Sequence, residues 1–76
     1  MSDVPDEVTQ WCGRFAAAAG VDPPTGEEID DLLALAAIAA HASARQAAPI
    51  TCWLAARAGM TIDAALAAAQ SLEAAS

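Results

Sequence analysis

The sequence predicts an all-α fold, a compact bundle or an orthogonal array of four short helices. Apolar residues recur at helical spacing, and residues that cap or break helices separate four such stretches. No segment shows the alternation or the β-branched clusters of a strand. Because 76 residues leave room for one domain, we expect residues 1–76 to form a single helical domain.

The first helix is expected to follow Asp3 as N-cap, with Pro5 in its opening turn. Gly20 should end it, because glycine adopts a positive φ without a Cβ clash, and residues 22–24 cannot continue a helix. An apolar stripe with a period of 3.6 residues supports this element. The stripe consists of Val4, Val8, Trp11, Cys12, Phe15 and Ala19.

A second helix is expected to begin at Thr25, where Thr25 and Glu28 have the spacing of a capping box. It has almost no polar face after Asp31, which indicates a central helix buried nearly all round, or one with a second apolar face covered by something else. We place Arg45 near its end, where a cation suits the negative pole of the helix dipole.

Two shorter helices complete the prediction. The third should run from Ala48 to Ala58 with Pro49 as its first residue, and should present Ile50, Trp53 and Leu54 on one side. The fourth should be capped by Thr61 and run from Ile62 through Leu72. Links of two to six residues predict roughly antiparallel neighbours.

The charge balance limits the partners. Ten Asp and Glu residues oppose three Arg, there is no Lys, and the net charge is −7, so nucleic acid and anionic membranes are not expected partners. The nearly uncharged run 32–44 is shorter than the roughly 20 residues of a membrane span. The acidic start does not resemble a secretory signal, so we expect a cytoplasmic protein.

The sequence shows no catalytic motif. His41 is the only imidazole and has no nucleophile motif beside it, and the carboxylates fall at helix starts, where capping explains them. Cys12 and Cys52 lack metal-ligand spacing and are expected to be packed thiols rather than a disulfide. We therefore expect a protein that is not an enzyme and holds no metal or cofactor. An acyl carrier protein is set aside, because the acidic helix start at 28–33 contains no serine to carry a prosthetic group.

Four short helices cannot cover all the apolar side chains, so some apolar surface should remain for a partner. Trp11 and Trp53 either fill the core or form part of that surface, because tryptophan is enriched at interaction hot spots.

The segment from His41 to Thr51 has two interpretations. His41 and Arg45 share a helix face, and Thr51 is expected in the first turn of the third helix, so the three could hold a phosphate or carboxylate. Alternatively, His41 and Arg45 hydrogen-bond the carbonyls that close the second helix. We favour the second interpretation, because one or two cations offer little to a charged ligand.

A leucine- and alanine-rich helix ends in Ala-His and is followed by an arginine, by an Ala-Ala-Pro link with a threonine, and by a short helix before a glycine. The positions of this pattern are His41, Arg45, Ala48, Pro49 and Thr51. Together with the early Trp11 and the last helix from Thr61, they resemble a small helical domain of unknown function known from actinobacteria.

Such domains occur alone or attached to a nucleotidyltransferase-like protein of molybdopterin-guanine dinucleotide synthesis, and beside formate dehydrogenase accessory proteins. The resemblance implies an accessory module that contacts a molybdoenzyme, a cofactor-synthesis protein or a second copy of itself. The expected contact lies at or near 41–51 and includes Trp53. The alternative is a protein that binds a small anion or a pterin through His41, Arg45 and Thr51.

Overall fold

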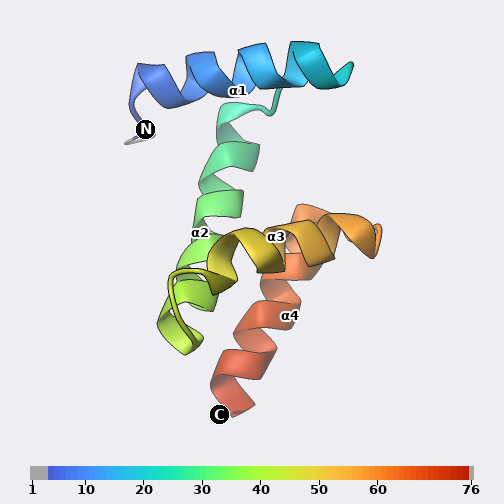
Figure 1. Cartoon of the computed structure of the whole chain (residues 1–76). Coiled ribbons are helices and arrows are strands. Elements are labelled where there is room, and N and C mark those ends of the chain that lie inside the picture. Colours follow the sequence, from blue (N-terminus) through green and yellow to red (C-terminus); the bar gives the residue numbers. More distant parts are fainter. Residues whose placement is uncertain (1–3, 76) are drawn as a thin grey trace. The chain divides into compact units, whose positions relative to one another are not determined.

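The computed structural model describes residues 4–75, which form four α-helices and no strand (Figure 1). They are α1 (Asp6–Ala19), α2 (Gly26–Ala42), α3 (Ala47–Arg57) and α4 (Ile62–Ala75). The all-α prediction with four short helices is confirmed. By its internal contacts the chain divides after Asp30 into two compact units, so that the first turn of α2 belongs with α1 and the rest of α2 with α3 and α4.

Side-chain caps explain the starts of α2 and α4. The amide of Thr25 donates to the Glu28 carboxylate at 2.8 Å, and the amide of Glu28 donates to the Thr25 hydroxyl at 3.1 Å. These reciprocal bonds form the predicted capping box and satisfy two amides that the helix leaves without partners. The Thr61 hydroxyl accepts from the amide of Ala64 at 3.1 Å, which confirms Thr61 as the cap of α4.

Glycine ends α1 and α3 in the same way. Gly20 has a φ of 74° and Gly59 a φ of 71°. At the end of α1 the amide of Gly20 donates to Ala17 and that of Val21 to Ala16, and the same pattern follows α3. Both ends are Schellman motifs, in which the left-handed residue lets the chain turn back on the last carbonyls.

Substitutions of Gly13 in α1 and of Gly20, which follows its last residue, should have opposite effects. A Cβ at Gly13 or Gly20 would meet no atom within 4 Å, so steric contact does not distinguish them. Gly13→Ala should raise the free energy of unfolding by about 0.5–1 kcal/mol, because alanine loses less backbone entropy inside a helix. Gly20→Ala should lower it by about 1–2 kcal/mol, because alanine strains at positive φ.

Urea titrations followed by circular dichroism measure both changes, with the unsubstituted chain as reference. Asparagine tolerates the left-handed region better than alanine, so Gly20→Asn should recover part of the loss. Equal effects of the two alanine substitutions would contradict the left-handed conformation assigned to Gly20.

Three of the four helices have boundaries that differ from the prediction. Pro5 is the residue before α1 rather than part of its first turn, and Asp3, the predicted N-cap, lies outside the described residues. The second helix ends at Ala42, so Arg45 belongs to the link. The third helix begins at Ala47 rather than Ala48 and ends at Arg57. Pro49 is its third residue, a position that still needs no amide hydrogen.

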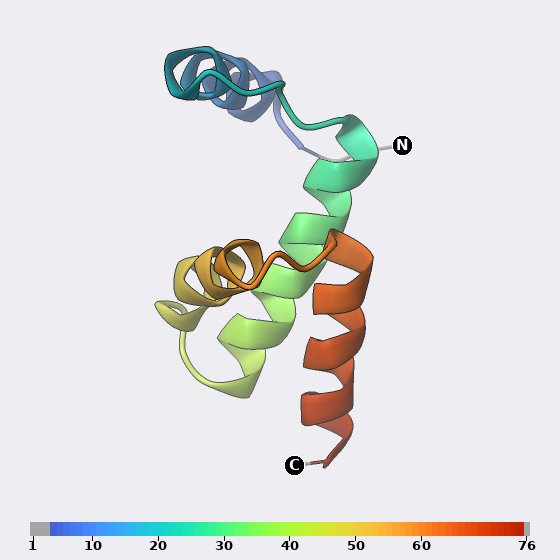
Figure 2. The ribbon, with the colours of Figure 1, turned by 90° about the vertical axis from the view of Figure 1, so that its right-hand side faces the viewer.

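In the second unit α3 crosses both of its neighbours. Figures 1 and 2 show the end of α2 and the whole of α4 side by side and running in the same direction, with α3 crossing them. The helices that follow one another are therefore crossed, and the antiparallel expectation is wrong for this unit. Leu35, Ala39 and Ala65 are its buried residues, and Leu35 alone among the described large side chains is fully buried.

The first unit has an even smaller core. Its buried residues are Ala16 of α1 and Ile29 of α2. Cys12 is half-buried, and so is Cys52 of α3; both are free thiols. Leu33 of α2 is half exposed, so the expectation of a second helix buried nearly all round is not met.

Candidate functional site

Large apolar side chains are exposed on α3, on α4 and between them. Leu72 is 75% exposed, Trp53 58% and Leu54 51%, and Ile50 and Met60 are exposed as well. Exposed apolar surface of this kind often marks an interaction site. Half of the residues of α4 are alanine, so this helix offers few large side chains to cover these exposed residues.

Three of these exposed residues, Leu54, Met60 and Leu72, border a groove of about 380 Å³, which we call the α3–α4 groove. Its lining is apolar except for the hydroxyl-bearing Thr51. The residues from α4 follow the spacing i, i+3, i+4 and i+7, which places them on one face of the helix. The lining consists of Leu35, Thr51, Leu54, Ala55, Ala58, Met60, Ala65, Ala68, Ala69 and Leu72.

A second hollow of about 240 Å³ shares Thr51, Ala69 and Leu72 with this groove and extends to the end of α2. Its polar lining side chains are Ser43, Thr51 and Glu73. Leu72 therefore lies between two apolar hollows while remaining largely exposed. This geometry suits the side chain of another protein better than a polar small molecule, because so few polar groups converge on it.

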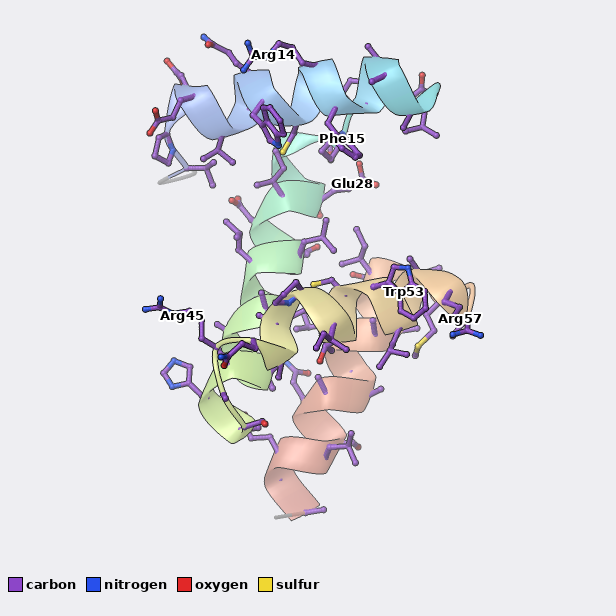
Figure 3. The ribbon with its side chains drawn as sticks, viewed as in Figure 1. Arg14, Phe15, Glu28, Arg45, Trp53 and Arg57 are labelled. Atoms are coloured by element: carbon purple, nitrogen blue, oxygen red, sulfur yellow. The ribbon has the colours of Figure 1, made fainter. Side chains whose placement is uncertain are left out.

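The structure separates the predicted site residues. Of the six, Thr51 lines both hollows, whereas His41, Arg45, Ala48, Pro49 and Trp53 line neither. His41 is exposed in the last turn of α2, and the Arg45 side chain extends away from the helices (Figure 3). Within residues 4–75 neither side chain hydrogen-bonds a carbonyl at the end of α2, contrary to the interpretation that we favoured.

The start of α3 also differs from the anion-binding interpretation. Thr51 is the fifth residue of α3 and lies in its second turn, not the first. The amide of Ala47 donates to Ala44 at 2.9 Å and that of Ala48 to Arg45 at 3.2 Å. Pro49 has no amide hydrogen, so the first three positions of the helix offer no donor to an anion.

Trp53 forms a small exposed pair with the last residue of its helix. The guanidinium carbon of Arg57 lies 5.0 Å from the centre of the Trp53 ring, within the range of a cation–π contact (Figure 3). Trp53 precedes Leu54 in the sequence, and Leu54 lines the α3–α4 groove. Trp53 is therefore a surface residue. This agrees with the interpretation that the tryptophans form part of an exposed apolar surface.

Sequence reasoning did not find the groove residues Leu54, Met60 and Leu72 as a set. The only signal available was the small-residue face of α4 with Leu72 one turn further on, and an alanine-rich helix shows such a face anywhere. Among residues 4–75 no group of three His, Cys, Asp or Glu side chains could hold a metal ion. The described helices include none that is long and apolar enough to cross a bilayer.

The comparisons with known proteins yield one family. A family model described as a domain of unknown function, DUF6457, matches residues 3–76. No curated protein matches. No solved structure matches either.

Proposed function

The chain belongs to the DUF6457 family of unknown function, and we propose that it is a non-catalytic accessory module that binds another protein through the α3–α4 groove. One observation carries the proposal: Leu54, Met60 and Leu72 remain exposed around an apolar groove. Hydrophobic association is the simplest use of such a groove.

The energetics favour a protein as the ligand. Covering a large aliphatic side chain that is exposed contributes about 1.5–3 kcal/mol, so several such residues supply enough for a specific contact after the cost of association. Trp53 and Arg57, next to the groove, belong to the residue types that dominate interaction hot spots. His41 and Arg45 lie outside the groove.

The resemblance of the sequence to domains found beside molybdenum-cofactor proteins suggests the partner. We propose a protein of molybdopterin-guanine dinucleotide synthesis or a molybdoenzyme such as formate dehydrogenase, in the cytoplasm of an actinobacterium. A second copy of the chain is the other candidate for the same groove.

Co-expression with a molybdopterin-guanine dinucleotide synthesis protein and with formate dehydrogenase, followed by co-purification and light scattering, tests the proposal. We expect a stoichiometric complex or a defined homo-oligomer. A chain that stays monomeric and retains neither protein would refute it. Titration of a pterin, a nucleotide or phosphate should leave the melting temperature unchanged; a rise that Arg45→Ala abolishes would instead support a small-molecule binder.

A further inference from the structure

The other unit carries an apolar surface of its own. Three apolar side chains of α1 are exposed: Val8 by 37%, Trp11 by 58% and Phe15 by 62%. Their spacing of three and four residues places them on one side of the helix. We call these three residues the Trp11 stripe.

The stripe is distinct from the face that α1 packs inside its unit. Ala16 is buried and Cys12 and Gly13 are half-buried, so the packed side of the helix runs through small residues. The stripe lies to one side of it. The rings of Trp11 and Phe15 are 6.3 Å apart and tilted, which makes them a joined aromatic surface rather than two isolated side chains.

The charge of the chain is concentrated around this stripe in sequence. Residues 1–30 carry seven carboxylates and one arginine, a formal charge of −6, whereas residues 31–76 carry three carboxylates and two arginines, a formal charge of −1. Glu7 is one turn from Trp11 on the same side of α1. Arg14, the single cation, has its guanidinium carbon 5.6 Å from the centre of the Trp11 ring.

We propose that the Trp11 stripe binds a basic amphipathic helix of another protein. An apolar face fits the stripe, and lysine or arginine at its borders complements the carboxylates of residues 1–30. A second copy of this chain is a poor occupant, because it would bring two units of charge −6 together. The surface lies on a different unit from the α3–α4 groove, so this proposal is independent of the one made for that groove.

A synthetic helical peptide of leucine and lysine, labelled with fluorescein, provides the probe. Fluorescence anisotropy of the full chain with this peptide should show saturable binding that weakens as salt rises from 50 to 500 mM, because opposite charges are screened. A peptide of leucine and glutamate with the same pattern should bind at least about tenfold more weakly.

Trp53 offers a matched control for Trp11. Both rings are 58% exposed, and each has an arginine stacked on it. Trp11→Ala and Phe15→Ala should each lower the affinity for the leucine–lysine peptide about tenfold or more. Trp53→Ala should change this affinity less than about twofold. Circular dichroism of the variants should match that of the unsubstituted chain, because these side chains are exposed.

Four results would overturn the proposal. They are absence of binding to the leucine–lysine peptide, equal binding of the leucine–glutamate peptide, an equal loss from Trp53→Ala, and binding that Trp11→Ala leaves intact. Binding that survives Trp11→Ala would show that charge alone attracts the peptide. Binding of the chain to phosphatidylcholine vesicles but not to the peptide would identify a membrane-binding face instead.

Discussion

Leu35→Ala should lower the free energy of unfolding by about 2–5 kcal/mol, a large part of the stability of so small a protein. Leu35 is 1% exposed and has the only fully buried large side chain among the described residues. It borders both the α3–α4 groove and a smaller hollow of about 90 Å³ near Cys52 and Ile62. Truncation would enlarge these spaces and remove the largest contact of the core.

Leu33→Ala is the control for this substitution. Leu33 lies two residues earlier on the same helix and is 51% exposed, so its loss should cost less than about 1 kcal/mol. Urea unfolding followed by circular dichroism gives both values, and the slope of each transition shows whether it remains a single step. Similar losses for the two variants would mean that Leu35 is not the centre of the core.

The local features of the fold could be predicted from the sequence. The capping box at Thr25 and the cap at Thr61 depend on side chains three residues from the amides they bind. Gly20 and Gly59 depend on a positive φ that other residues avoid. None of these contacts requires knowledge of how the helices pack.

The link between α2 and α3 could not be predicted to the residue. The sequence around it is rich in alanine, which neither ends nor starts a helix, and Pro49 fits any of the first helical positions. The end of α2 at Ala42 therefore carries no side-chain signal, and Arg45 was assigned to the helix because of its charge. Taking Pro49 as the first helical residue places Thr51 in the first turn of α3, whereas the helix begins at Ala47.

The candidate site required tertiary structure. Polar residues such as His41 and Arg45 attract attention in an apolar sequence, but the two hollows are lined by residues that α2, α3 and α4 bring together. Figure 2 shows how α3 crosses the other two helices. Whether Leu54 and Leu72 lie in the core or at the surface depends on that crossing, because both have helical spacing in either case. Only the general expectation of uncovered apolar surface was available, and the exposure of both tryptophans agrees with it.

Leu72→Ser should weaken binding of the protein partner, or self-association, by about tenfold to a hundredfold while leaving the unfolding midpoint nearly unchanged. Leu72 is 75% exposed and borders both apolar hollows, so its side chain has little core to lose and much area to contribute to a complex. An anilinonaphthalene sulfonate dye, whose fluorescence rises on apolar surface, gives a readout that needs no partner. Its signal should fall in Leu72→Ser but not in Leu33→Ser, since Leu33 is an exposed leucine that lines neither hollow. Retention of both dye and partner by Leu72→Ser would place the contact outside the α3–α4 groove.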